Sequence, residues 1–477
     1  MIARTDVRRW LRLPALLLAA GALAGCATVA SVDRSIAQAA DIARERAGVE
    51  ARPIASVDEQ RALAAEVERL LAAPLSADDA VRIGVLHSPG FQALLQDSAA
   101  AMAAAVQSGR PLNPTFAFER MVRGGEVEIG RLLSLQVLNL LTWPSRAQLA
   151  ELRVEQRQIT LAGDIVGRAA EVRKAWVEAV AARQTLAYWR DVLSAAEAGA
   201  ELARRMQGVG NFSRLQRARE QAFYAETAMQ VARAERANLA AREALVRLLG
   251  LDRAQAARLQ VPARLPDLPP APREPVAVTQ AMLEQRLDVQ AAQRALEHVE
   301  RVGGLTRVDS VLGELEFGIA RNSATGEPLQ RGFELKLPIP VFDAGDARRA
   351  ESGAATRAAV ERLRQTLVDA HSQTAEAYGA YRTAHDLARH FRDEIVPLRQ
   401  TILDESLLRY NGMLIGVFEL LASAREQVGA VIQAIDAQRA YWVAEATLQN
   451  ILIGRAEPLA RLLEPAAPAP AAGAKPH

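Results

Sequence analysis

The chain has 477 residues, half of them hydrophobic but only 4% aromatic, and its 58 basic residues nearly balance its 56 acidic ones. This mixture is typical of long helices that pack through small side chains rather than of a large globular core. The small net charge gives no basic excess for nucleic acid, and the single cysteine excludes an internal disulfide and a thiolate-rich metal site.

Residues 1–25 have the pattern of a signal peptide. Arginines precede an apolar run over residues 13–23, as in export signals. The run ends in Leu-Ala-Gly-Cys, which resembles the lipobox of bacterial lipoproteins, so we expect Cys26 to become a lipidated N-terminus and residues 26–75 to be a lipid-anchored segment. The alternative is an ordinary secretory signal with a chance cysteine near its cleavage site. No later run of about 18 apolar residues is free of charges, so a further membrane crossing would require a barrel of strands.

The rest of the sequence matches itself weakly at an offset of roughly 200 residues, which indicates an internal duplication. Three pairs of segments carry the match in the same order: 87–93 with 285–291, 137–151 with 337–351, and 205–220 with 409–426.

The duplication predicts two repeats joined by a linker. The segment from Pro262 contains six prolines within 14 residues, which favours an extended connection. The alanine- and proline-rich C-terminus has little apolar surface to bury. We therefore expect a first repeat over 76–261, a linker over 262–276, a second repeat over 277–456 and a flexible tail over 457–477.

Each repeat is predicted to begin with a helix, which is followed by a pair of strands near residues 114–139 in the first repeat and 311–340 in the second. Phe116 and Phe118 alternate with polar or small residues in the first repeat, and Phe317 and Ile319 do so in the second. Arg131 interrupts the first-repeat alternation. Four strands of about ten residues cannot close a barrel, and an open sheet edge is not tolerated in lipid. Three copies would supply twelve strands, an even number that is usual for such barrels.

A helical hairpin is predicted to follow each strand pair, over residues 144–250 and 344–454. Apolar residues recur at intervals of seven in the first long helix, which is the spacing of coiled coils. Pro397 should break or kink the second long helix. The fold class is therefore mainly α with a small β part.

The segments 337–349 (LPIPVFDAGDARR), 208–220 (GVGNFSRLQRARE) and 409–426 (RYNGMLIGVFELLASARE) are similar to parts of TolC-like outer-membrane efflux factors. The first resembles the passage from barrel strand to helix, and the other two resemble the turns of the helical hairpins. The resemblance implies that the barrel-to-helix transitions contain Trp143, Pro144, Pro338, Pro340, Phe342 and Gly345.

The resemblance also implies a function. TolC-like factors are homotrimers with a twelve-strand barrel in the outer membrane, which continues as a periplasmic barrel of helices and engages an adaptor protein and an inner-membrane pump. A passive duct of this kind is not an enzyme and needs no cofactor. The alternative is a non-conducting, lipid-anchored coiled-coil scaffold in the periplasm. The cargo stays open between metal ions such as copper and drug-like organic compounds.

The hairpin turns are the candidate functional sites. Chain reversal favours residues that adopt positive φ, so we expect the adaptor to dock on turns built from Gly208, Gly210, Asn211, Asn411 and Gly412.

Glu419 is the candidate pore constriction. In the family an acidic residue follows the second turn and forms a ring that favours cations, and Glu419 is the only acid within seven residues after Gly412. The first turn has neutral Gln216 at the comparable place. The alternative for Glu419 is a solvated residue or an ion pair with Arg409 or Arg425. The six histidines show no ligand spacing on a helical face, so no metal site is expected.

Overall fold

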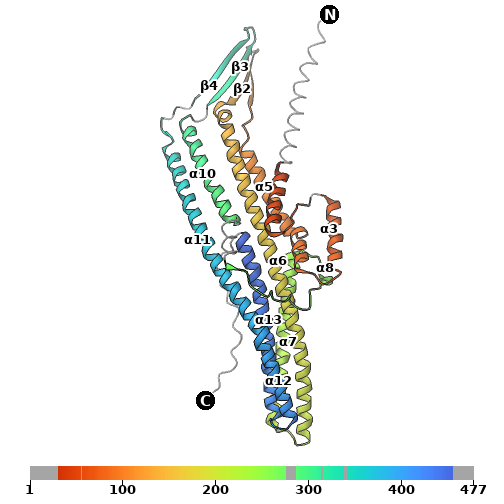
Figure 1. Ribbon diagram of the computed structural model, residues 1–477. Helices are drawn as coiled ribbons and strands as arrows, with labels where there is room; N and C mark the ends of the chain where they lie inside the picture. The colour runs from red at the N-terminus through yellow and green to blue at the C-terminus, as the bar shows by residue number, and fades with distance from the viewer. Residues whose placement is uncertain are drawn as a thin grey trace. The chain divides into compact units, whose positions relative to one another are not determined.

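A computed structural model describes residues 31–54, 56–275, 286–312, 315–337, 339 and 341–454. The predicted signal peptide, Cys26, Pro338, Pro340 and the whole predicted tail lie outside these residues. Most of the elements are labelled in Figure 1. In chain order they are α3 (Val57–Leu70), α4 (Ala77–Leu86), α5 (Pro89–Ser108), β1 (Thr115–Arg123), β2 (Glu126–Gln136), α6 (Val137–Gly208), α7 (Arg214–Leu249), α8 (Arg253–Arg258), α10 (Leu287–Leu312), β3 (Glu316–Ala324), β4 (Gln330–Lys336), α11 (Asp346–His390), the π-helical turn η1 (Phe391–Ile395), α12 (Val396–Asn411) and α13 (Val417–Ile453).

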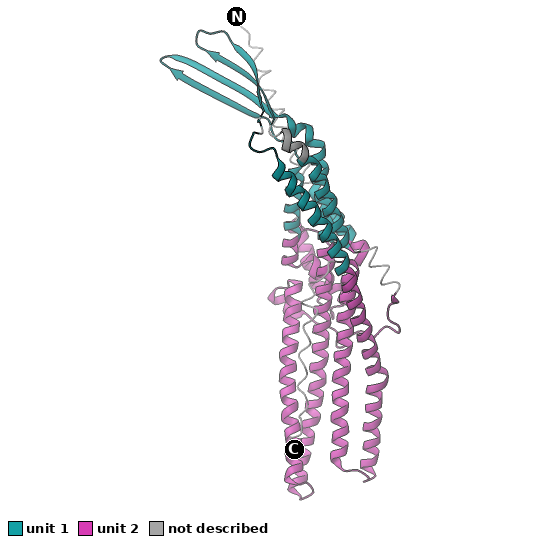
Figure 2. Ribbon diagram, turned by 90° about the vertical axis from the view of Figure 1, so that its left-hand side faces the viewer, with its two compact units in different colours: residues 1–42, 95–162, 287–369 teal, residues 43–94, 163–286, 370–477 magenta. Residues whose placement is uncertain are grey.

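These elements belong to two compact units, coloured separately in Figure 2. Unit 1 contains the sheet, most of α5, all of α10, and the first parts of α6 and α11. Unit 2 contains the rest of α6 and α11 together with α3, α4, α7, α8, α12 and α13.

Within the described residues, four strands form one antiparallel sheet in the order β1-β2-β3-β4. Leu133 of the first repeat pairs with Ile319 of the second, so the central strand pair joins the two repeats. Strands β1 and β4 each have one partner in this sheet and form its two edges.

Helix α6 begins earlier than the sequence predicts. It starts at Val137, directly after β2, and contains Pro144 in its interior. The expectation that Trp143 and Pro144 lie at the strand-to-helix junction is therefore wrong, because they lie two turns inside the helix. The reason is burial at helical spacing. Leu138, Asn139 and Thr142 are all buried, and the amide of Asn139 accepts a hydrogen bond from the backbone N–H of Leu112 at 3.0 Å.

Pro397 lies in the first turn of α12, immediately after the π-helical turn η1. Val396 donates its N–H to the carbonyl of Phe391, five residues back. A proline removes one helical donor, and a π-helical turn is a common way to accommodate an interruption within a helix. The chain therefore continues as helix from α11 into α12 through a widened turn.

In unit 2, the second part of α6 lies beside α7, α12 and α13 (Figures 1 and 2). Arg190 of α6 pairs with Glu235 of α7 at 2.9 Å, and Arg439 of α13 pairs with Glu178 of α6 at 2.7 Å. The buried Trp176 of α6 donates its indole N–H to the carbonyl of Leu75 at 2.8 Å. These contacts anchor the hairpins that end in the two turns described next.

Candidate functional site

The two hairpin turns have the same backbone design. In the turn after α6, Gly210 donates its N–H to Gln207 and Asn211 donates to Met206. In the turn after α12, Met413 donates to Tyr410, and the next residue donates to the carbonyl of Arg409. Both patterns are Schellman motifs, which end a helix with one left-handed residue.

That left-handed residue is a glycine in one turn only. Gly210 has φ of +84°, whereas the equivalent residue of the second turn is Met413, with φ of +58°. Gly412 has φ of −78° and is the C-cap of α12. The expectation that Gly208, Asn211 and Gly412 need positive φ is therefore wrong. Each Schellman motif places only its second residue after the helix in the left-handed region, and Gly208 itself is the last residue of α6.

The helices that leave the turns start differently. Ser213 caps α7 through a capping box, in which its hydroxyl accepts from Gln216 N–H at 3.2 Å and the Gln216 amide accepts from Ser213 N–H at 2.6 Å. Helix α13 has Gly416 at its N-cap and no side-chain cap. Glu419 stands three residues after Gly416, as Gln216 stands three after Ser213, so the two occupy equivalent positions.

Glu419 is exposed in the first turn of α13. Among the described residues, no hydrogen bond or ion pair engages its carboxylate. The predicted alternative of an ion pair with Arg425 is wrong, because Arg425 instead reaches Glu220 of α7 at 3.1 Å. The Glu419 carboxylate is therefore exposed at the start of α13, whereas Gln216 is held by its own helix cap.

Aromatic and ionic contacts join the two hairpins near their turns. The rings of Phe212 and Phe418 lie 6.1 Å apart, and the guanidinium of Arg425 lies 4.3 Å from the ring centroid of Phe223. The carboxylate of Glu220 is only 4% exposed. This contact was not predicted from the sequence, because its partners are 205 positions apart and come from different repeats.

The sheet has two faces of different chemistry. Directly paired residues of adjacent strands point to the same face, and residues two apart along a strand share it. One face, which we call the apolar face, carries Phe116, Leu133, Ile319 and Phe333 in a single cross-strand row. Their exposed fractions are 51% or more. The opposite face carries Glu119, Glu126, Glu128, Glu316 and Glu334.

The described helices contain no segment long and apolar enough to cross a membrane. The described residues also contain no group of three or more histidine, cysteine and acidic side chains placed to hold a metal ion.

No protein-family model and no curated protein matches the sequence. Solved structures do match. The outer membrane protein VceC of Vibrio cholerae gives a TM-score of 0.66 at 14% identity, over 84% of this chain and 99% of that chain. CusC, from a study of folding and transmembrane channel formation, gives a TM-score of 0.66 at 15% identity, over 81% of this chain and 94% of that chain. The Campylobacter jejuni outer membrane channel CmeC gives a TM-score of 0.64 at 13% identity, over 84% of this chain and 88% of that chain.

The chain has the fold of an outer-membrane channel. This confirms, at the level of the fold, the resemblance to TolC-like factors and the prediction of a mainly helical chain with a small sheet.

In this channel fold, the predicted transition residue Gly345 directly precedes α11 and has φ of +74°. Its N–H donates to the Asp343 carboxylate at 2.7 Å, and this hydrogen bond holds the pKa of Asp343 below its usual value. Phe342 is completely exposed.

The linker between the repeats is a fixed part of unit 2. We call residues 261–273 the linker strap. The indole of Trp442 donates to the carbonyl of Pro266 at 3.0 Å, and the amide oxygen of Gln184 accepts from Leu265 N–H at 3.2 Å. The strap therefore contacts α6 and α13.

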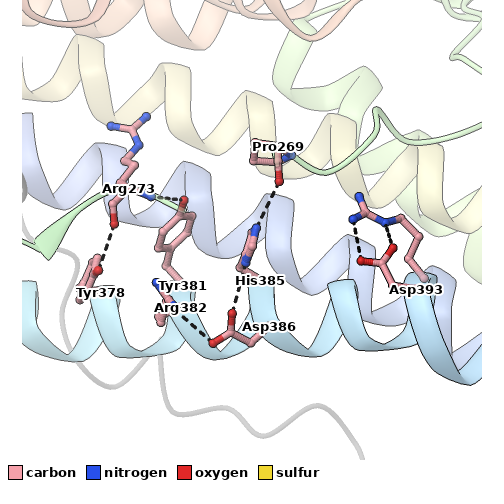
Figure 3. Close-up of polar contacts among 9 residues, drawn as sticks. Pro269, Arg273, Tyr378, Tyr381, Arg382, His385, Asp386 and Asp393 are labelled. Atoms are coloured by element: carbon pink, nitrogen blue, oxygen red, sulfur yellow. Dashed lines mark hydrogen bonds and ion pairs between the residues drawn. The ribbon is translucent and has the colours of Figure 1, made fainter. Parts of the chain in front are cut away.

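A second set of contacts joins the strap to α11 (Figure 3). Tyr378 donates its hydroxyl hydrogen to the carbonyl of Arg273 at 3.0 Å, and Arg273 N–H donates to the hydroxyl of Tyr381 at 3.1 Å. The fully buried ring of His385 lies between the carbonyl of Pro269, 3.2 Å from Nε2, and the carboxylate of Asp386, 3.4 Å from Nδ1. The proline-rich composition predicted an extended connection but not these partners, because they come from helices distant in sequence.

Proposed function

We propose that the chain is one subunit of a passive, trimeric outer-membrane duct in a tripartite efflux system. The observation that carries the proposal is the sheet. It has two unpaired edges, β1 and β4, and one exposed apolar face. In lipid an unpaired edge leaves backbone N–H and C=O groups without partners, at a cost of several kcal/mol for each group. Pairing β4 of one copy with β1 of the next satisfies both edges.

Three copies close this arrangement with twelve strands, as the sequence resemblance implies. The apolar face then contacts lipid and the acidic face lines the lumen. Helices α6, α7, α11, α12 and α13 form the periplasmic part, and lipidation of Cys26 adds a second attachment to the outer membrane. The solved channels that share the fold support this role.

The hairpin turns are the proposed docking sites for a periplasmic adaptor, which connects the duct to an inner-membrane pump. The docking turns contain Gly208, Gly210, Asn211, Asn411 and Gly412, and the free carboxylate of Glu419 forms the proposed constriction ring. The Gln216 side chain is engaged in the cap of α7, whereas α13 has no side-chain cap and the carboxylate of Glu419 has no partner among the described residues. This difference supports the assignment of Glu419 to the pore. The cargo is a small molecule or a metal ion delivered by the pump.

Cysteine crosslinking tests the edge pairing. Single cysteines placed along β1, starting at Ala117, are combined with cysteines along β4, starting at Gly332, in purified full-length protein. We expect at least one combination to give covalent trimers. The matched control pairs Leu132→Cys with Ala320→Cys, which face each other within one chain and should crosslink within that chain.

Conductance in planar bilayers tests the duct itself. A heat-modifiable trimer that conducts agrees with the proposal. A protein that is extracted as a soluble monomer after delipidation, gives no edge crosslinks and does not conduct favours the alternative, a lipid-anchored periplasmic scaffold.

A further inference from the structure

Three arginines form one row across the apolar face of the sheet. Arg131 of β2 is the direct partner of Arg321 of β3, which in turn is the direct partner of Arg331 of β4. Direct partners on adjacent strands share a face and have Cβ atoms roughly 5 Å apart. The fourth member of the row is Phe118 of β1. We call Arg131, Arg321 and Arg331 the arginine row.

The apolar face offers these arginines no counter-charge. All five acidic residues of the strands, from Glu119 to Glu334, lie on the opposite face according to the pairing register. Among the described residues, no ion pair engages any member of the row, whereas Lys336 on the acidic face pairs with Glu316 at 3.6 Å.

Such a row is unfavourable by itself. Like charges directly opposite each other on neighbouring strands destabilise a sheet. Three in succession, without an acidic partner among the described residues, would therefore favour an external anion that lies between them.

The position of the row indicates where that anion lies. Leu135, Phe317 and Leu335 form the apolar row nearest the helices, and the row of Phe116 and Phe333 comes next. The arginine row is four residues beyond Leu135 along β2, or roughly 13 Å at about 3.3 Å per residue, toward the strand turns.

A cationic side chain on the lipid face of a barrel is costly at the bilayer midplane and costs little near the interface. On the turn side of the row the same face is mixed, with Arg120 and Ser323 beside Ile129 and Val127. The row is therefore expected at the depth where apolar chains give way to lipid headgroups. The strongest anion at that depth is the lipid phosphate, whose oxygens match the paired N–H donors of a guanidinium.

We propose that the arginine row binds phosphate-bearing headgroups of the leaflet on the side of the strand turns, and so fixes the depth of the sheet in the membrane. The proposal rests on the proposed function, since it requires the apolar face to contact lipid. Arg120, on the same face and one row nearer the turns, lies diagonally from Arg131 and extends the cationic surface.

Lipid binding by purified full-length trimers tests the proposal. The protein in neutral detergent is titrated with phosphatidylglycerol, with diacylglycerol, which lacks phosphate, and with inorganic phosphate, and bound lipid is counted by native mass spectrometry. The test variant is Arg321→Gln/Arg331→Gln. The matched control is Arg123→Gln/Lys336→Gln, which removes the same charge from the opposite face.

The wild-type protein and the control should prefer phosphatidylglycerol to diacylglycerol by roughly tenfold, and the test variant should lose most of this preference. Inorganic phosphate at equal concentration should not compete, because it has no apolar chains. An unchanged preference in the test variant, an equal loss in the control, or full competition by inorganic phosphate overturns the proposal.

Planar-bilayer conductance of the same preparations separates this proposal from the proposed function. Variants that conduct like the wild type but show no headgroup preference contradict only the arginine row. A wild-type chain that neither inserts nor conducts contradicts both.

Discussion

Gly210 and Met413 occupy the same position in the two hairpin turns. Each is the left-handed residue of a Schellman motif, with φ of +84° and +58° respectively. Other equivalent pairs, such as 206 with 409 and 216 with 419, have the same separation, so the structure aligns the two turns without a gap. The comparison of the two repeats in the sequence had paired Arg205 with Arg409, whereas the structure pairs Met206 with Arg409.

The first prediction concerns the cost of that backbone conformation. Met413→Gly should stabilise the second turn by about 1 kcal/mol, and Gly210→Ala should destabilise the first by about 1 kcal/mol, because a Cβ is unfavourable at positive φ. Gly412→Ala is the matched control. Its φ is negative and an added Cβ would meet no atom closer than 3.5 Å, so we expect little change. Hydrogen exchange of the turn amides measures the local opening free energies. Equal losses of stability in Gly412→Ala and Gly210→Ala would contradict the assignment of the left-handed position to Gly210 and Met413.

The second prediction concerns the proposed constriction. Glu419→Gln should weaken the block of single-channel current by divalent cations, because it removes one negative charge from each subunit of the proposed trimer. Gln216→Glu is the reciprocal variant, and Glu426→Gln, whose carboxylate pairs with Arg399, is the control. We expect the reciprocal variant to have a smaller effect than Glu419→Gln, since the residue at this position is held by the cap of α7. If the block is unchanged in Glu419→Gln, this residue does not form the ring.

The third prediction concerns the ion pair between the repeats. Glu220→Ala should destabilise the paired hairpins by about 2 kcal/mol, because it leaves the partly buried Arg425 without its anion. A double replacement of both residues by methionine should recover most of this loss, since it removes the uncompensated charge as well. Denaturant unfolding monitored by helical circular dichroism provides the comparison. A double variant as unstable as Glu220→Ala would show that packing, rather than charge, dominates at this contact.

The fourth prediction concerns the linker strap. Leu268 is buried in a cluster that includes Tyr381 and Tyr441. Leu268→Ala should cost about 2 to 4 kcal/mol through lost burial and a cavity. Leu239→Ala on α7 is the control, because Leu239 is 58% exposed and should change stability little. Protease cleavage within residues 261–273 should become faster only in the Leu268 variant. Unchanged cleavage and stability would mean that the strap does not depend on this side chain.

The fifth prediction concerns pH. Hydrogen bonds from Arg204 and Arg205 hold the pKa of Glu201, near the end of α6, at about 2 instead of its usual 4.5. A carboxyl group with a depressed folded-state pKa stabilises the fold above its unfolded pKa, and this contribution fades as the pH falls. The stability difference between wild type and Glu201→Gln should therefore be constant above about pH 5 and vanish by about pH 2. Because the group is exposed, salt should reduce the difference. A difference that is independent of pH would exclude this ion pair as its source.

The periodic parts of this protein were predictable from its sequence. Alternation in Phe116–Phe118 and Phe317–Ile319 marked strands that the structure contains, because successive side chains of a strand point to opposite faces of the sheet. The predicted strand pairs and long helices indicated a mainly helical chain with a small sheet, and the fold agrees. The start of α6 was missed because Pro144 was treated as a boundary, whereas burial of Leu138 and Asn139 extends the helix back to β2.

What the sequence alone determined is therefore local: which segments alternate, which recur at helical spacing, and where the chain reverses. Tertiary structure alone decided which residues meet across the repeats. Arg131 interrupted an apolar pattern in the sequence, and only the strand register placed it beside Arg321 and Arg331. Glu419 was visible as an acid after a turn, and only the caps showed that Gln216 is engaged while Glu419 is free. The physical reason is that periodicity follows from backbone geometry within one segment, whereas pairing depends on which of many distant segments pack together.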